Sequence, residues 1–150
     1  MSGISVTSTG ADRSHVERRR LILEKYPQVQ ELFGKDPLTF KIAVGIFALQ
    51  LMLAAFMGYL GLDYWWLALI LAIGVGAFAN HANFVIIHDA IHNCVFDNPL
   101  ANKWTAILAD LSNAFPTAMG FRCYHIKHHS HLSAYDYDAD IPSQWEVDWV

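Results

Sequence analysis

Charged side chains are scarce in this sequence, and they are unevenly placed. Asp, Glu, Lys and Arg make up 16 % of the 150 residues, against about a quarter in an ordinary soluble domain. Residues 1–41 hold seven Lys/Arg and five Asp/Glu, whereas residues 42–150 hold three and nine. The basic run Arg18-Arg19-Arg20 is short and lies beside acidic residues. We therefore expect no nucleic-acid partner.

Cysteine is also scarce, and the amino terminus shows no recognisable targeting signal. Cys94 and Cys123 are the only two cysteines, too few for a disulfide framework. About forty residues at the amino terminus are polar, so we expect no cleaved secretory signal there. Glycine stands at position 3 and not at position 2, so the N-myristoylation pattern is absent.

Two long apolar runs dominate what the sequence does contain. Residues 42–62 include one strongly polar side chain, Gln50, and residues 65–87 are interrupted only near their end. A helix of about 20 residues spans the roughly 30 Å of a bilayer's hydrocarbon core. An aromatic cluster at the break between the runs is typical of a membrane interface; it comprises Tyr59, Tyr64, Trp65 and Trp66. We predict an all-α membrane protein with a transmembrane helical hairpin; a buried helix pair in a soluble protein is the alternative.

Shorter elements are predicted on either side of the hairpin. Residues 1–41 form an amino-terminal segment with one helix ending near Lys25 and a second starting at Pro27. Residues 42–150 form the membrane domain. Within it, the apolar spacing over residues 104–115 predicts an amphipathic helix, lying in the interface or packed on other helices.

The charge distribution predicts an orientation for this integral membrane protein. Basic residues ahead of the first span favour a cytoplasmic amino terminus. Two crossings then return the chain to the cytoplasmic side just before His88. The segment that follows is expected to hold cytoplasmic or interfacial helices.

Histidine is the residue type that indicates chemistry. Seven of the eight histidines lie within residues 81–131. A pair at i and i+4, and a triplet at i, i+3 and i+4, each share one face of a helix. Nitrogen ligands without thiolates suit iron, copper, nickel or zinc, bound at one centre or at two adjacent ones. The candidate ligands are His88 and His92 in residues 88–92, and His125, His128 and His129 in residues 125–129.

The remaining histidines and nearby carboxylates have other expected roles. His81 lies seven residues before the first motif, and we expect it to support the ligands or line a path to them. Asp89 is a candidate to orient a ligating imidazole. His15 is expected at the surface, and His131 in solvent or as a hydrogen-bond partner. Orienting roles are also conceivable for three later acids, although a solvated acidic loop is favoured for them: Asp136, Asp138 and Asp140.

Taken together, these residues resemble the membrane fatty-acid desaturase and hydroxylase superfamily. Its members carry a His-x-x-x-His motif after a hairpin and a His-x-x-His-His motif further on. Three other segments are similar to the sphingolipid Δ4-desaturases (dihydroceramide desaturases) within it. They are residues 18–27 ahead of the first span, Asn80-His81, and the run Asp138-x-Asp140-Ile-Pro142. The resemblance covers about residues 15–142.

The resemblance implies a specific enzyme. O₂ and two electrons from a cytochrome b5-type carrier would introduce the C4–C5 double bond of dihydroceramide at a di-iron centre, in a eukaryote at the endoplasmic reticulum membrane. The five histidines of the two motifs would be iron ligands. These 150 residues lack the family's second hairpin and third motif, another His-x-x-His-His. We therefore expect an amino-terminal part that is inactive alone. Asp89 stands where the family often has Glu.

Two functions from other classes remain open. A non-catalytic membrane metal-binding or transport protein would use the histidines for zinc or copper. A truncated regulator would self-associate with an intact enzyme and need no metal. Among enzymes, three other classes share the histidine motifs: acyl-lipid desaturases, sphingolipid C4-hydroxylases and alkane-type hydroxylases. Only the resemblances in residues 18–27 and 138–142 favour a Δ4-desaturase.

Overall fold

The computed structural model describes residues 15–113, 115–132, 138, 140–142, 146 and 148–149. All secondary structure among these residues is helical, which confirms the predicted fold class. The chain divides into two compact units, residues 1–34 and 35–150. Compact units need not coincide with functional domains, so the predicted boundary after residue 41 stays a prediction.

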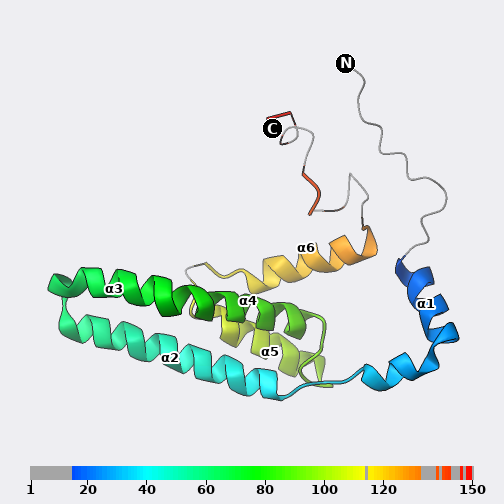
Figure 1. Cartoon of the computed structure of the whole chain (residues 1–150), viewed down its shortest axis with the longest axis horizontal. Helices are drawn as coiled ribbons and strands as arrows, with labels where there is room; N and C mark the ends of the chain where they lie inside the picture. The colour runs from blue at the N-terminus through cyan, green and yellow to red at the C-terminus, as the bar shows by residue number, and fades with distance from the viewer. Residues whose placement is uncertain are drawn as a thin grey trace. The chain divides into compact units, whose positions relative to one another are not determined.

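The first unit holds the two short helices that the sequence predicts. They are α1 (His15–Lys25) and the 3-10 helix η1 (Pro27–Leu32), coloured blue in Figure 1. Pro27 occupies the first turn of η1, where its missing N–H leaves no hydrogen bond unmade. The Arg19 guanidinium lies 5.7 Å from the centroid of the Phe33 ring, which links α1 to the end of η1.

The second unit is built on the predicted hairpin of two long helices, which lie side by side in Figure 1. Its first arm is α2 (Leu38–Leu60), which starts slightly earlier than expected. Gly61, with φ 84°, adopts the left-handed conformation that favours glycine, and the 3-10 turn η2 (Leu62–Tyr64) completes the reversal. The second arm consists of α3 (Trp65–Leu71), the π-helical turn η3 (Ala72–Gly76) and α4 (Ala77–Ile91).

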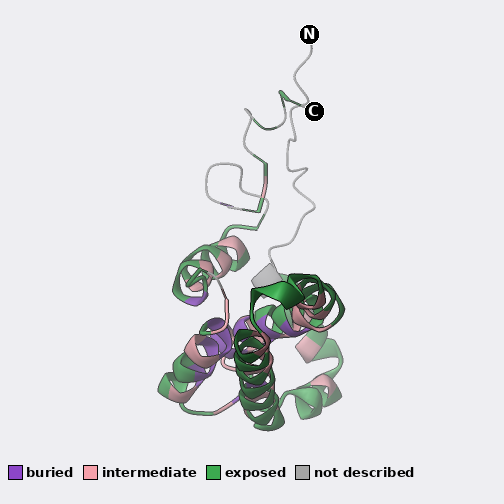
Figure 2. Cartoon of the chain, turned by 90° about the vertical axis from the view of Figure 1, so that its left-hand side faces the viewer, coloured by how far each residue is buried: buried purple, intermediate pink, exposed green. Residues whose placement is uncertain are grey.

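The apolar side chains of the hairpin face outward. In the most apolar stretches of residues 38–60 and 62–91, 6 % and 22 % of the residues are buried, respectively. Leu51, Met52 and Phe78 are each more than half exposed. In Figure 2, which looks along the helices, much of the outer surface of the bundle is coloured green for exposed residues. A core helix of a soluble protein would bury these residues, whereas a bilayer is itself an apolar solvent. Both arms are long and apolar enough to cross a membrane.

Helix α5 (Pro99–Asp110) packs against α4 and α2 through small and polar residues. The predicted bounds, residues 104–115, were wrong. The helix begins at Pro99 because Asn98 caps it, its Oδ1 accepting from the Leu100 N–H at 2.8 Å. Trp104 points outward, 62 % exposed. Small residues on the inner face allow close helix approach, as in membrane proteins; the buried residues are Asn102, Thr105, Ala106, Ala109 and Asp110.

The fully buried Asn102 fixes the loop that follows α4. Its Oδ1 accepts from the N–H groups of Val95 and Phe96 at 3.1 and 3.0 Å. Its Nδ2 donates to the carbonyls of Phe96 and Asn98 at 2.6 and 2.9 Å. These bonds satisfy backbone groups that burial would otherwise leave unpaired. The loop therefore has one well-defined path from the end of α4 into α5.

A second buried amide explains the polar residue inside the first apolar run. Asn83 on α4 is fully buried, and its Nδ2 donates to Gln50 Oε1 on α2 and to Ser112 Oγ after α5, both at 3.0 Å. Polar side chains that bond across helices stabilise packing where the hydrophobic effect contributes little. Gln50 thus joins the hairpin to the end of α5.

Helix α6 (Ala118–Ser130) is anchored at its start by Asp110. The carboxylate Oδ2 accepts from the N–H groups of Thr117 and Ala118 at 2.7 and 2.8 Å. Oδ1 accepts from Thr117 Oγ1 at 3.0 Å and from Asn113 Nδ2 at 2.8 Å. Burial alone would raise the pKa of Asp110, but these hydrogen bonds outweigh burial and hold the pKa below its usual range. The negative charge also complements the helix N-terminus.

We predict that Asp110→Asn lowers the free energy of unfolding near neutral pH by about 2 kcal/mol, because hydrogen bonds to a buried charge are lost. The folded-state pKa lies below the unfolded one. The stabilisation is therefore complete above the unfolded pKa and fades as the pH falls through the folded value. Denaturant unfolding in detergent micelles across this pH range measures the effect. The exposed Asp97, as Asp97→Asn, is the control; an Asp110 deficit that persists unchanged in strong acid would contradict the prediction.

Candidate metal centre

Helices α4 and α6 lie side by side and pair their rings in register. Both rows of rings repeat every fourth residue, which is one face of a helix. The two members of each pair are 37 positions apart, so the helices run in the same direction with matching turns. The centroid distances are 5.1 Å for Phe84–Phe121, 4.8 Å for His88–His125 and 4.8 Å for His92–His129.

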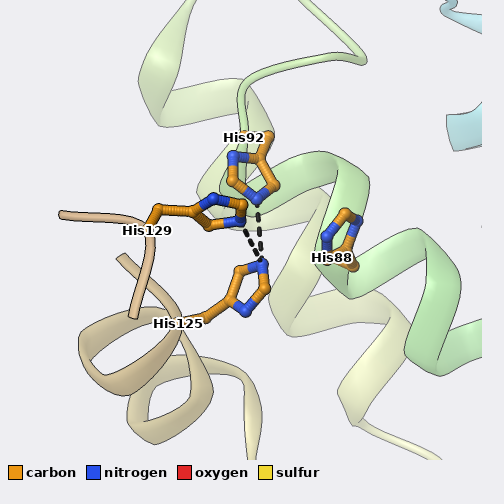
Figure 3. A group of neighbouring side chains, drawn as sticks. All are labelled: His88, His92, His125 and His129. Atoms are coloured by element: carbon orange, nitrogen blue, oxygen red, sulfur yellow. Dashed lines mark hydrogen bonds between the residues drawn. The ribbon is translucent and has the colours of Figure 1, made fainter. Parts of the chain in front are cut away.

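Four imidazoles converge near the C-terminal ends of α4 and α6 (Figure 3). One ring nitrogen from each lies within 4.8 Å of the other three. Nε2 of His125 is 3.0 Å from Nε2 of His92 and 3.1 Å from Nε2 of His129. Ring nitrogens this close must share a proton or a cation, and four imidazole donors fit a transition metal. The four residues are His88, His92, His125 and His129, which the sequence proposed as ligands.

The electrostatics at two of the rings, His92 and His125, favour the neutral form. Burial lowers the pKa of His92, and His88 and His129 lower it further. Burial also lowers the pKa of His125, followed by its neighbour His129. A lowered pKa keeps an imidazole in its neutral form, the form that binds metal. His92 and His125 are therefore held in the form that can bind a cation.

His128, the fifth proposed ligand, faces a different group. Its Nδ1 lies 2.7 Å from Oδ1 of Asp138 and 3.3 Å from Oδ2 of Asp140. The hydrogen bond with Asp138 raises the pKa of His128, although desolvation opposes it. In the neutral ring, a proton on Nδ1 leaves Nε2 as the free donor atom. The sequence placed His125, His128 and His129 on one face of a helix, but in the structure His128 belongs to a different group from the other two.

Asp138 corrects a second expectation. The sequence favoured a solvated acidic loop for this segment, but the Asp138 side chain is 2 % exposed. Its carboxylate bonds both to His128 and to the backbone N–H of Asp140, at 3.0 Å. Asp140 itself is exposed, and Asp136 lies outside the described residues. The partner of Asp138, His128, lies ten residues earlier in the chain, and local sequence patterns do not reveal such a contact.

The other predicted site residues lie around the cluster. Asp89 Oδ1 is 3.2 Å from Nδ1 of His88, in position to orient that ring, and its role stays a prediction. His81 is exposed and lies outside the converging group, so its supporting role also stays a prediction. His131 ends α6 with Nδ1 2.8 Å from Ser130 Oγ, as a hydrogen-bond partner. The His15 side chain lies outside the described part of the chain.

Sequence reasoning missed the aromatic layer beside the histidines. Phe121 stacks on His125, with ring centroids 4.7 Å apart, and its ring also lies 6.5 Å from that of His88. Phe84 packs against Phe121, with ring centroids 5.1 Å apart. A usable signal was present, because each phenylalanine lies four residues before a motif histidine.

A helical hairpin of membrane-spanning length with two histidine motifs meeting beside it defines a membrane protein with a polyhistidine centre. The chain belongs to the fatty acid desaturase family, whose pattern matches residues 64–149. Residues 9–38 match a second family, the sphingolipid Δ4-desaturases. Both matches confirm the resemblance that the sequence motifs indicated.

Individual relatives agree with this assignment. A sphingolipid delta(4)-desaturase DES1-like protein of Oryza sativa is 40 % identical over 137 residues, covering 91 % of this chain and 40 % of the relative. The sphingolipid delta(4)-desaturase of Candida albicans is 38 % identical, covering 92 % and 37 %. The human sphingolipid delta(4)-desaturase/C4-monooxygenase DES2 is 38 % identical, covering 90 % and 42 %. This chain therefore spans about two fifths of their length. No solved structure matches it significantly.

We predict that Asp138→Ala changes the tautomer of His128 in the metal-free chain. The carboxylate holds the proton on Nδ1, and without it the ring loses that preference. Long-range ¹H–¹⁵N NMR of ¹⁵N-histidine-labelled chain in micelles, at a pH above the raised pKa of His128 so that the ring is neutral, reports which nitrogen carries the proton. Asp140→Ala is the matched control, because its carboxylate is exposed and more distant. An unchanged His128 spectrum in Asp138→Ala would show that this contact does not select the tautomer.

Proposed function

We propose that this chain is the metal-binding amino-terminal part of a sphingolipid Δ4-desaturase. The reaction is the O₂-dependent formation of the C4–C5 double bond of dihydroceramide at a histidine-ligated di-iron centre. The observation that carries the proposal is the convergence of His88, His92, His125 and His129 from two separate motifs. Family membership and the names of the relatives support the substrate class.

The histidines would divide between two metal positions. The four converging imidazoles supply a complete nitrogen set for one iron. His128 would offer Nε2 to the other, with Nδ1 held by Asp138. The relatives extend well beyond the matched region, and we expect a third His-x-x-His-His motif there to complete the second position. On this proposal the chain alone holds metal but does not turn over substrate.

Iron with O₂ supplies an oxidant strong enough for unactivated C–H bonds. Two hydrogens leave the lipid, and two electrons from a cytochrome b5-type carrier, with two protons, complete the reduction of O₂ to two waters. The chain's own residues hold and shield the centre. Asp89 and Asp138 orient imidazoles through Nδ1. Phe121, with Phe84 packed against it, forms an apolar surface beside His88 and His125.

The proposed location follows from the hairpin and its charges. We place both arms across a bilayer, with the amino terminus and the histidines at the cytoplasmic face. In a eukaryotic cell this membrane would be the endoplasmic reticulum. A lipid then reaches the centre from the bilayer, while the electron carrier arrives from water.

A C4-hydroxylase is the second candidate, favoured by one observation. Two relatives, from human and from Caenorhabditis elegans, carry names that join Δ4-desaturase with C4-monooxygenase. Both outcomes begin at the same carbon of the sphingoid base. Product analysis of the complete enzyme separates them, because a hydroxylated product without a double bond would replace the desaturase proposal.

We predict that the isolated chain binds Fe(II) or Co(II), and that His125→Ala weakens binding at least tenfold. His125 contacts three other members of the cluster, so its loss opens the centre. Metal content after dialysis and the Co(II) absorption spectrum measure this. His131→Ala, at the exposed end of the same helix, should retain full binding. A preference for zinc or copper, with no iron bound, would support the non-catalytic metal-protein alternative.

In the complete enzyme we predict that His128→Ala abolishes conversion of dihydroceramide to ceramide while membrane insertion stays normal. The reason is the loss of a ligand at the second metal position. Lipid mass spectrometry measures conversion, and alkaline extraction of membranes checks insertion. Near-normal conversion would remove His128 from the ligand set.

A further inference from the structure

Helix α4 ends in a complete C-terminal cap, and His92 is the cap residue. Asn93, which follows it, adopts the left-handed conformation with φ 56°. The N–H of Asn93 donates to the Ala90 carbonyl at 3.0 Å, and the N–H of Cys94 donates to the Asp89 carbonyl at 2.9 Å. This pair of bonds is the Schellman motif. A proposed metal ligand therefore lies on a backbone whose path is fixed.

One carbonyl at this helix end finds its partner on another helix. The last four carbonyls of a helix have no partner within it. At the end of α4 the Schellman motif satisfies two of them, and the Cys94 thiol donates to the carbonyl of His92 at 3.7 Å. The carbonyl of Ile91 accepts from Nη1 of Arg122, on α6, at 3.1 Å. The guanidinium charge also complements the partial negative charge of the helix C-terminus.

The Arg122 contact crosses the level of the histidines. Positions 37 apart pair on the two helices, so Arg122 lies level with Val85 on α4 and reaches forward six positions to Ile91. The His88–His125 pair lies between these two levels. A contact that runs obliquely between two parallel helices opposes both the rotation and the sliding of one against the other. Arg122 thus braces α6 against α4 at the place where the imidazoles meet.

This brace does not depend on the state of the imidazoles. The hydrogen bonds between histidine rings depend on which ring nitrogens carry protons. A guanidinium stays protonated at every physiological pH, and a backbone carbonyl does not titrate. The bond between Arg122 and Ile91 can therefore hold the two helices in register before a metal binds.

We propose that Arg122 is a positioning residue of the metal centre. By bonding to the Ile91 carbonyl, it holds α6 at the rotation that brings His125 and His129 to the imidazoles of α4. The proposal rests on the proposed function for the identity of the metal ligands. Arg122 contacts neither metal nor substrate in this role. It pre-organises the four donors, so that less conformational entropy is lost when a cation binds.

NMR of the full 150-residue chain in micelles, without metal, tests the rotation of α6 directly. In deuterated chain with protonated histidines, nuclear Overhauser effects report rings that lie close together. We expect these effects for His88–His125 and for His92–His129, whose ring centroids are each 4.8 Å apart. Arg122→Gln, which lacks the charge and the reach, should lose them, and Arg122→Lys should retain them because one charged donor suffices for one carbonyl. Undiminished effects in Arg122→Gln, or equal loss in both variants, would overturn the proposal.

Cobalt binding shows whether Arg122 acts through the histidines of α6. Arg122→Gln should weaken Co(II) binding at least fivefold in the otherwise unaltered chain. It should change binding less than twofold where His125 and His129 are already replaced by alanine, because the residues that it positions are then absent. An equal loss in both backgrounds would mean that Arg122 supports only the fold, and would overturn the proposal. Arg20→Gln, an exposed arginine paired with Glu24, is the matched control and should leave both measurements unchanged.

The two measurements separate this proposal from the proposed function. If the unaltered chain binds neither Fe(II) nor Co(II), while Arg122→Gln loses the contacts between rings, the proposed function fails and the positioning of α6 stands. If the chain binds metal and the ring contacts persist in Arg122→Gln, the positioning role alone fails.

Discussion

The parallel packing of α6 on α4, turn against turn, is the constraint on which the centre depends. Each helix alone presents two or three imidazoles, and neither can surround a cation. Only when residue 88 faces residue 125, and residue 92 faces residue 129, do four nitrogens converge. A rotation of either helix by one residue, about 100°, would point its histidines away. The fold must therefore preserve the rotation of each helix about its own axis, the helical phase, rather than a distance along the sequence.

Buried polar contacts set that phase at points remote from the histidines. Asp110 fixes where α6 begins, Asn102 fixes the loop that closes α4, and Asn83 joins α4 to α2. Directional hydrogen bonds suit this task inside a membrane. The dispersion attraction between a helix and lipid differs little from that between two helices, so dispersion alone is a weak guide to how the helices pack. The large apolar side chains, which would build the core of a soluble protein, are free to face outward here.

The sequence predicted the features that depend on local pattern. The hairpin, the short helices around Pro27 and the helical placement of both motifs follow from run length, proline position and i, i+4 spacing. The bounds of α5 were wrong because large apolar residues were taken to mark its start, whereas Asn98 and Pro99 set it. The setting of His128 could not be predicted, because Asp138 reaches it from a segment ten residues further on. Periodicity within a helix carries no information on such a contact.

The two aspartates that bracket α6 also bear on how the motif could be moved. Asp110 precedes the helix and organises its first turn, and Asp138 follows it and positions the ring of His128. A graft of the thirteen residues of α6 alone into a designed helical bundle would carry every histidine of the His-x-x-His-His motif. It would nevertheless leave the helix start without its anchor and one ring without a fixed tautomer. The transferable unit is thus the stretch from one aspartate to the other, about twice the length of the helix that bears the ligands.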